Sequence, residues 1–234
     1  MKIALLGYGR MGQTIERLAA ERGHQIVLRV DPSHDSIAQL HLADIAIDFS
    51  IPDVAFDHIT ACFEQGVPVV SGTTGWLDRY DEACKICIEK DGAFIYGSNF
   101  SLGVNLFFEL NKKLAELMKP FDHYQVGMTE IHHTKKLDAP SGTAISLAEH
   151  LKEAEIIKNW TIEDSNSDQV LKIEVERTED VPGTHSVSYN SSVDELYIKH
   201  TAHNREGFAL GAIIAAEWLQ DKQGIYSMRD VLNL

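Results

Sequence analysis

The chain has 234 residues, which is enough for one large domain or two small ones with an apolar core. Hydrophobic residues make up 44% and charged residues 24%, as in ordinary soluble globular proteins. The formal net charge of −14 argues against a protein that wraps nucleic acid, since phosphate binding needs clustered Lys and Arg, but it leaves room for a local basic pocket at Lys135 and Lys136.

The first predicted element is the apolar run 2–6, which ends in a glycine loop. This run is too short for the core of a signal peptide, and no stretch of the chain approaches the roughly 18 consecutive apolar residues of a membrane span. We therefore interpret residues 2–6 as a strand and expect a cytoplasmic protein.

Strands and helices alternate through the first hundred residues. A helical periodicity with Ile15, Leu18 and Ala19 on one face follows the first strand and closes at Gly23. The further expected strands are 25–30, 45–49, 67–71 and 93–97, and the further expected helices are 53–65 and 78–90. This alternation predicts βαβ units and a parallel sheet.

The pattern changes after Asn99. A helix is expected over 104–118, and another after Ser141. The strand-like segments are 124–133, 170–177, 185–190 and 195–200, the most loop-like segment is 159–168, and a final helix is expected over 207–219. The sequence thus predicts an α/β protein with a Rossmann-type dinucleotide-binding domain (1–102 and 206–234) and an α+β domain with an open mixed sheet (103–205).

Three glycines, Gly7, Gly9 and Gly12, form a dinucleotide-binding fingerprint between the first strand and the first helix. The first permits a tight turn, the second lets the backbone approach a pyrophosphate, and the third lets helix and strand pack closely. Asp31 ends the second strand, where a carboxylate accepts hydrogen bonds from the adenosine ribose and repels a 2′-phosphate. Arg29 could soften that repulsion, but the carboxylate of Asp31 favours NADH over NADPH.

Two later loops lie at strand ends, where ligands of such sheets bind. Their small and hydroxyl residues could line a nicotinamide and its ribose, or could be plain turn residues. The candidates are Gly72, Thr73, Thr74, Ser98, Asn99 and Phe100.

The segment 130–144 concentrates titratable groups at a strand end and then opens a helix. An imidazole at His132 or His133 can act as an acid at neutral pH, and the two face opposite sides of a strand. Ser141 is a plausible N-cap, and the amides of Gly142 and Thr143 offer an anion site beside the positive charge of Lys136.

The alternative for this segment is a solvated charged loop followed by a helix cap. A metal is not expected, because adjacent histidines on a strand diverge and no nearby Cys or carboxylate pair completes a ligand set. The three cysteines do not indicate a disulfide framework. Cys84 and Cys87 have redox or metal spacing, but they lie in an expected helix without a second ligand pair.

These motifs resemble those of the dihydrodipicolinate reductase (4-hydroxy-tetrahydrodipicolinate reductase) family, over nearly the whole chain. The matching segments are the N-terminal glycine loop, 48–50, 72–75, 99–105, 130–144, 182–185, 200–205 and 208–209. The resemblance implies NAD(P)H-dependent reduction of a cyclic unsaturated dicarboxylate in the diaminopimelate route of lysine biosynthesis, and a homotetramer built through the second domain's sheet.

The resemblance also implies residue roles. His132 matches the family's proposed general acid and Lys136 its partner in proton donation. The matches to substrate-carboxylate contacts are His133, Lys136, Ser141, Gly142 and Thr143. The positions at or beside cofactor contacts are Gly7, Arg10, Met11, Gly12, Asp31, Gly72, Thr74, Asn99 and Phe100, and Arg205 lies at the hinge between domains.

One segment departs from the family. The fourteen residues 32–45 replace a longer excursion in typical members, which indicates a simplified adenosine end of the cofactor site. Two other functions stay open. One is a dehydrogenase acting on a substrate such as aspartate semialdehyde; a phosphorylating enzyme of that kind needs a cysteine nucleophile, and all three cysteines lie in expected helices of the first domain. The other is a nucleotide-binding redox sensor without turnover.

Overall fold

The computed structural model describes residues 1–31, 37–165, 167 and 169–234. The chain divides into two compact units, which are Met1–Leu102 with Glu206–Leu234 (unit 1) and Gly103–Arg205 (unit 2). Among the described residues, no helix is both long and apolar enough to cross a membrane.

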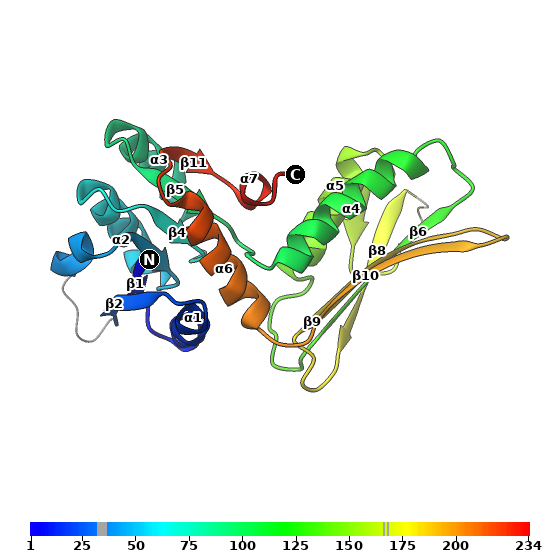
Figure 1. Cartoon of the computed structure of the whole chain (residues 1–234). Coiled ribbons are helices and arrows are strands. Elements are labelled where there is room, and N and C mark those ends of the chain that lie inside the picture. The colour runs from blue at the N-terminus through cyan, green and yellow to red at the C-terminus, as the bar shows by residue number, and fades with distance from the viewer. Residues whose placement is uncertain (32–36, 166, 168) are drawn as a thin grey trace. The chain divides into compact units, whose positions relative to one another are not determined.

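Unit 1 is built on a six-stranded parallel sheet with the order β11-β5-β4-β3-β1-β2 (Figure 1). Its strands are short and largely buried, as expected of a parallel sheet covered on both faces. The strands are β1 (Lys2–Leu6), β2 (Gln25–Val30), β3 (Ile45–Asp48), β4 (Val69–Ser71), β5 (Ala93–Tyr96) and β11 (Gly224–Tyr226). The helices are α1 (Arg10–Glu21), α2 (Pro52–Glu64), α3 (Tyr80–Glu89), α6 (Glu206–Leu219) and α7 (Met228–Leu232), with 3-10 turns η1 (Ile37–Leu42) and η2 (Leu77–Arg79).

Two apolar cores lie on the two faces of this sheet. Helices α1 and α6 pack on one face through buried residues such as Ile15 and Ile213, and helices α2 and α3 pack on the other through Ile59 and Ala83. Helix α6, which follows unit 2 in the sequence, is thus part of unit 1. Its Gly211 lies against the backbone of Phe100, since an added Cβ would stand 1.8 Å from the Phe100 carbonyl oxygen.

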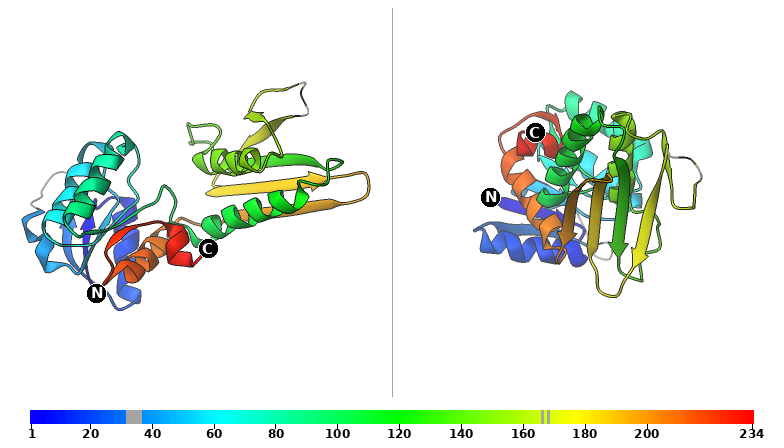
Figure 2. Two further views of the ribbon diagram at one scale, coloured as in Figure 1. Left: turned by 90° about the horizontal axis from the view of Figure 1, so that it is seen from above. Right: turned by 90° about the vertical axis from the view of Figure 1, so that its right-hand side faces the viewer.

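Unit 2 is a five-stranded mixed sheet with the order β10-β9-β6-β8-β7, which Figure 2 shows face-on in its right-hand view. Strands β6–β9 and β9–β10 pair antiparallel, and β6–β8 and β7–β8 pair parallel. The elements are α4 (Leu102–Met118), β6 (Gln125–His132), α5 (Gly142–Glu153), β7 (Asn159–Thr161), β8 (Val170–Arg177), β9 (Gly183–Asn190) and β10 (Glu195–Ala202). Helices α4 and α5 cover one face, with a core that includes Phe107, Leu147 and Tyr189.

The predicted fold class is confirmed, with local corrections. The segment 159–168 is wrong as a continuous loop, because Asn159–Thr161 forms β7 and pairs with β8. The expected strand 67–71 begins only at Val69, since the Val67 amide donates to the Cys62 carbonyl at the end of α2. The expected helix 78–90 begins as a 3-10 turn at Leu77. Part of the shortened segment, residues 32–36, lies outside the described residues.

Candidate active site

The three fingerprint glycines of unit 1 differ in what surrounds them. An added Cβ would stand 2.3 Å from the Phe49 carbonyl oxygen at Gly7 and 2.3 Å from the Gly7 carbonyl oxygen at Gly12. Gly7 also has a φ of +96°, which favours glycine. An added Cβ at Gly9 would meet nothing within 4 Å. Packing therefore requires Gly7 and Gly12, whereas Gly9 borders open space that a phosphate group can approach.

Helix α1 begins beside this space. Its N-cap is Gly9, which offers no side-chain cap, and the exposed Arg10 opens the first turn. The amides at a helix start and the helix dipole favour an anion, so the residues present fit the pyrophosphate of a dinucleotide.

The other predicted cofactor positions fall into two groups by their exposure. The exposed or half-exposed ones are Met11, Asp31, Gly72, Thr74, Ser98 and Asn99. Two are buried: Thr73, whose hydroxyl accepts a hydrogen bond from the Ser50 amide at 2.8 Å, and Phe100, whose ring packs edge-on against Phe49. The side chains of Thr73 and Phe100 therefore hold the loops after β4 and β5 in place by contacts within unit 1. Arg205 is exposed and is the last residue of unit 2.

A fully buried carboxylate, Asp48, ties the ends of β3 and β4 together. It accepts hydrogen bonds from the hydroxyls of Ser50 at 2.6 Å and Ser71 at 2.7 Å. His58 Nδ1 lies 3.8 Å from it. These bonds hold the strand ends from which the loops after β3 and β4 emerge.

Strand register brings charged groups of unit 2 together. Glu130 on β6 lies opposite His185 on β9, and His132 on β6 lies opposite Arg177 on β8. Alternate residues of a strand share a face, so Glu130 and His132 point the same way. Three neighbouring strands thus place one carboxylate, two imidazoles and one guanidinium in a single cluster.

Glu130 is the centre of this cluster and is fully buried. Its Oε2 accepts a hydrogen bond from the Ser141 amide at 2.9 Å and lies 3.6 Å from His132 Nδ1 and 3.8 Å from His185 Nε2. Its Oε1 accepts longer bonds from the Arg177 guanidinium, at 3.3 and 3.4 Å. Arg177 also donates to the Asp138 carbonyl at 2.8 Å, which fixes the loop after β6.

Helix α5 begins at this cluster. Ser141 is its N-cap, as predicted, with the hydroxyl accepting a hydrogen bond from the Ala144 amide at 3.2 Å. The same hydroxyl lies 3.0 Å from His185 Nε2. Gly142 is exposed and Thr143 half-buried in the first turn. The first-turn amides therefore remain at the surface beside the buried cluster.

Lys136 and His133 lie in the loop after β6 and are less buried than His132. The Lys136 ammonium donates to both carboxylate oxygens of Asp138 at 2.7 Å. That hydrogen bond lowers the pKa of Asp138 below its usual range. Asp138 is exposed, so an incoming substrate carboxylate could replace it at Lys136 with little loss of stability.

Burial sets the protonation of the two central histidines. It lowers the pKa of His132 below that of an ordinary histidine, while the Glu130 carboxylate opposes it by raising the pKa. Burial, followed by the charge of His132, lowers the pKa of His185 to about 3. His185 is therefore neutral at physiological pH, whereas at His132 the Glu130 carboxylate works against the effect of burial.

Among the described residues, ligand atoms of Glu130, His132 and His185 lie within 4.8 Å of one another, a grouping of types that can hold a metal ion. The expectation of no metal considered only the adjacent pair His132 and His133. The Arg177 guanidinium beside the same carboxylate disfavours a second cation, so the geometry fits a proton better than a metal ion.

Sequence patterns pointed to His132, Lys136 and Ser141 but not to the partners of His132. In the sequence Glu130 stands out only as part of the polar segment 130–144, and His185 only as the end of the segment 182–185. Arg177 was not singled out. The available signal was the alternation in β6, which puts Glu130 and His132 on one face.

The cysteines offer little nucleophilic character. All three are free, and Cys62 and Cys87 are buried in helices α2 and α3. Burial raises the pKa of the Cys87 thiol to about 11 and that of Cys62 further. A thiolate is the reactive form, so these residues are unsuited to covalent catalysis.

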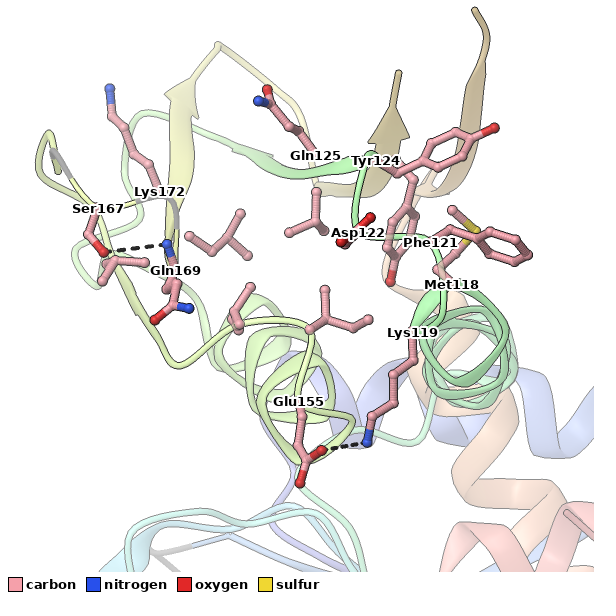
Figure 3. Close-up of a pocket in the computed structure, with 16 residues that line it drawn as sticks. Met118, Lys119, Phe121, Asp122, Tyr124, Gln125, Glu155, Ser167, Gln169 and Lys172 are labelled. Carbon is pink, nitrogen blue, oxygen red and sulfur yellow. Dashed lines mark hydrogen bonds and ion pairs between the residues drawn. The ribbon is translucent and has the colours of Figure 1, made fainter. Parts of the chain in front are cut away.

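A separate cavity of about 600 Å³ lies in unit 2 at the C-terminal ends of α4 and α5 (Figure 3). An ion pair between Lys119 and Glu155 closes one side of it, and Ser167 accepts a hydrogen bond from the Gln169 amide on another. None of the predicted site residues lines this cavity.

Comparison with known proteins adds an independent line of evidence. A family model described as the N-terminus of dihydrodipicolinate reductase matches residues 1–100, and one described as the C-terminus matches residues 103–232. A protein of Christiangramia forsetii named 4-hydroxy-tetrahydrodipicolinate reductase is 55% identical over 238 residues, covering 100% of this chain and 98% of that protein. A protein of the same name from Chromobacterium violaceum is 37% identical, covering 86% of this chain and 78% of that protein.

A solved structure gives the same picture of the fold. The dipicolinate-bound dihydrodipicolinate reductase from Paenisporosarcina sp. TG-14 aligns with a TM-score of 0.76 over 97% of each chain, at 20% sequence identity. At that identity the likeness concerns the fold alone.

Proposed function

The chain belongs to the dihydrodipicolinate reductase family, and we propose that His132, with the groups around it, supplies the proton for the family's reaction. The resemblance and the oxidoreductase assignment made from the sequence are confirmed. The reaction is the reduction of 4-hydroxy-tetrahydrodipicolinate to tetrahydrodipicolinate in the diaminopimelate route to lysine.

Unit 1 supports a nicotinamide dinucleotide as the cofactor, because its glycine loop leaves open space at Gly9 beside the start of α1. A bound NAD(P)H supplies the hydride. We propose a preference for NADH, supported by the carboxylate of Asp31 at the end of β2. Arg29, the nearest cation on β2, is held by Glu16 through a hydrogen bond of 3.0 Å.

The substrate is a cyclic dicarboxylate, and we propose that unit 2 binds it through cations and helix-start amides. Its carboxylates lie on Lys136, on His133 and on the first turn of α5 at residues 141–143. In the free protein Lys136 is paired with Asp138, so binding exchanges one carboxylate for another. Positive charge at these positions stabilises negative charge that develops on the substrate.

Hydride addition to the carbon far from nitrogen in a C=C–C=N system leaves an electron pair shared between the ring nitrogen and the neighbouring carbon. That carbon must then receive a proton. We propose that His132 donates it, assisted by Lys136. The observation that carries this proposal is the burial of an imidazole against a carboxylate, next to a helix start suited to a substrate carboxylate.

The reaction is tested by following NADH oxidation through the loss of the absorbance of the reduced nicotinamide. Freshly made cyclic substrate is compared with aspartate semialdehyde and with no substrate. We expect turnover with the cyclic substrate alone. Turnover with the semialdehyde would favour the dehydrogenase alternative, and binding of NADH without turnover would favour a redox sensor.

We also propose a cytoplasmic location and a homotetramer formed through the sheet of unit 2. Support for the assembly comes from large apolar side chains that are exposed at the β9–β10 turn and on β10, which are Val193, Leu196 and Tyr197. Exposed apolar side chains that gather on one element are typical of interfaces. Light scattering of the purified protein measures the mass directly.

A further inference from the structure

The site contains two buried groups that the reaction does not use directly, Glu130 and His185. Neither is assigned a contact with the substrate, yet both touch groups that are. Glu130 lies 3.6 Å from His132, and His185 lies 3.0 Å from the Ser141 hydroxyl. Their contacts bear on two protons, the one on the His132 ring and the one on the Ser141 hydroxyl.

Ser141 gives the first argument. A serine hydroxyl has one proton to donate and two lone pairs that accept. One lone pair accepts the Ala144 amide at 3.2 Å. If His185 Nε2 carries a hydrogen, the second lone pair accepts it at 3.0 Å, and the Ser141 proton is left to donate to a third group.

The protonated nitrogen of His185 follows from its surroundings. Its Nε2 faces both the Ser141 hydroxyl and, at 3.8 Å, the Glu130 carboxylate. Its Nδ1 is buried and, among the described residues, has no hydrogen-bond partner. A buried N–H without a partner costs more than a buried lone pair, so the hydrogen belongs on Nε2.

Glu130 gives the second argument. His132 Nδ1 is buried, and Glu130 Oε2 is the acceptor that faces it. At 3.6 Å the contact is longer than a hydrogen bond, and a movement of about 0.7 Å makes it one. Such contacts often tighten when substrate binds. His132 Nε2 lies on the other side of the ring, where an added Cβ on Gly183 would stand 3.1 Å away.

We propose that Glu130 and His185 are positioning residues: Glu130 holds the Nδ1–H of His132 so that Nε2 delivers the proton, and His185 fills a lone pair of Ser141 so that its hydroxyl donates to the substrate carboxylate. The inference rests on the proposed function. Glu130 also accepts the Ser141 amide, so one carboxylate fixes both the acid and the start of α5.

Several charged groups act on His132, and the test must separate Glu130 from them. They come from the same strand, from β8, from β9 and from the loop after β6. These groups are Glu130, Arg177, His185, Lys136 and Asp138.

The first experiment measures kcat against pH for Glu130→Gln. A general acid must be protonated to act, so kcat falls as pH rises above its pKa. Because the Glu130 carboxylate raises the pKa of His132, its loss should move this fall in kcat to lower pH by about one unit. We also expect kcat at the optimum to fall about 100-fold, since a misdirected imidazole is a poor donor. Glu130→Asp keeps the charge and should therefore bring the pH at which kcat falls part of the way back to that of the unaltered protein.

The second experiment compares His185→Leu with His185→Gln. The leucine variant removes the donor to Ser141 and should raise the KM for the cyclic substrate about tenfold with the KM for NADH unchanged, as expected for one lost hydrogen bond to a charged group. The glutamine variant keeps an N–H at the position of Nε2 and should recover most of the affinity. His123→Gln makes the same change at an exposed position of unit 2 and serves as the control.

The outcomes distinguish this inference from the proposed function. If His132→Gln keeps its kcat, the assignment of the acid is wrong whatever the other variants do. If His132→Gln loses activity while Glu130→Gln keeps the pH profile of the unaltered protein, or His185→Leu keeps its substrate KM, the positioning roles are overturned and the acid assignment stands.

Discussion

Units 1 and 2 each bury one carboxylate completely among the described residues, and the two are surrounded differently. Asp48 of unit 1 accepts short hydrogen bonds from the hydroxyls of Ser50 and Ser71. Glu130 of unit 2 has one short bond, from a backbone amide, and otherwise faces groups that are or can become positively charged.

This difference indicates that the buried carboxylate of Asp48 has a structural role, whereas that of Glu130 has a chemical one. Neutral hydroxyls satisfy a buried carboxylate without changing their own charge. Imidazoles near a carboxylate exchange protons, so the energy of the cluster depends on pH and on the substrate. Short hydrogen bonds from two hydroxyls satisfy Asp48, although His58 lies 3.8 Å away. Within the described part of the chain, Glu130 has no hydroxyl donor of this kind and is surrounded by two imidazoles and a guanidinium, which marks it as the reactive carboxylate.

The largest expected change in stability comes from removing the cation beside Glu130. Arg177→Ala leaves a buried carboxylate without its charged partner and should lower the free energy of unfolding by about 3 kcal/mol. Urea denaturation measures this loss. Arg17→Ala, at an exposed ion pair with Glu21, should cost much less, because solvent screens exposed charges. Equal losses for the two variants would contradict the distinction.

A smaller loss is expected at Asp48. Ser71→Ala removes a donor from the buried carboxylate and should destabilise the protein by about 2 kcal/mol. Because Ser71 does not titrate, the dependence of kcat on pH should keep its shape. A shift of that profile would mean that the carboxylate of unit 1 also takes part in proton chemistry.

Acid should destabilise unit 2 through His185. Its folded pKa of about 3 lies below the ordinary value of 6.5, so the unfolded chain binds more protons between these values. The free energy of unfolding therefore falls as pH falls through this window, with a loss of about 1 kcal/mol near pH 5.5, roughly one pKa unit below the ordinary value. His185→Gln should reduce this slope in denaturation curves at several pH values, whereas an unchanged slope would remove His185 as its source.

The smallest change in stability is expected at the glycine loop of unit 1. Gly9→Ala adds a methyl group in open space, so stability should change by less than about 1 kcal/mol while the KM for NADH rises about tenfold. Gly12→Ala forces a contact with the Gly7 carbonyl oxygen and should lower stability as well. An unaltered KM in Gly9→Ala would show that the open space is not used by the cofactor.

Local sequence patterns predicted most of the elements because helix and strand periodicities are short-range. They missed β7 and β11, which have three residues each and gain their pairing from β8 and β5. Three residues are too few to show a period, and unlike β4, which lies in the apolar run 67–71, these two strands are defined by their tertiary pairing.

The same limit explains the site. His132, Lys136 and Ser141 lie close together in sequence and were identified as one segment. Glu130 meets His185 and Arg177 only through the register of three strands, which sequence spacing does not specify. Sequence spacing therefore predicts the candidate segment, whereas the groups that surround His132 come together only in the fold.

The central claim is that unit 2 supplies the proton while unit 1 binds the cofactor. His132→Gln tests it most directly when kcat and the Kd for NADH are both measured, by absorbance and by fluorescence. Loss of a general acid should lower kcat by about 10²–10⁴-fold with the Kd for NADH unchanged. A variant that keeps its kcat, or one that loses NADH binding along with it, would contradict the account.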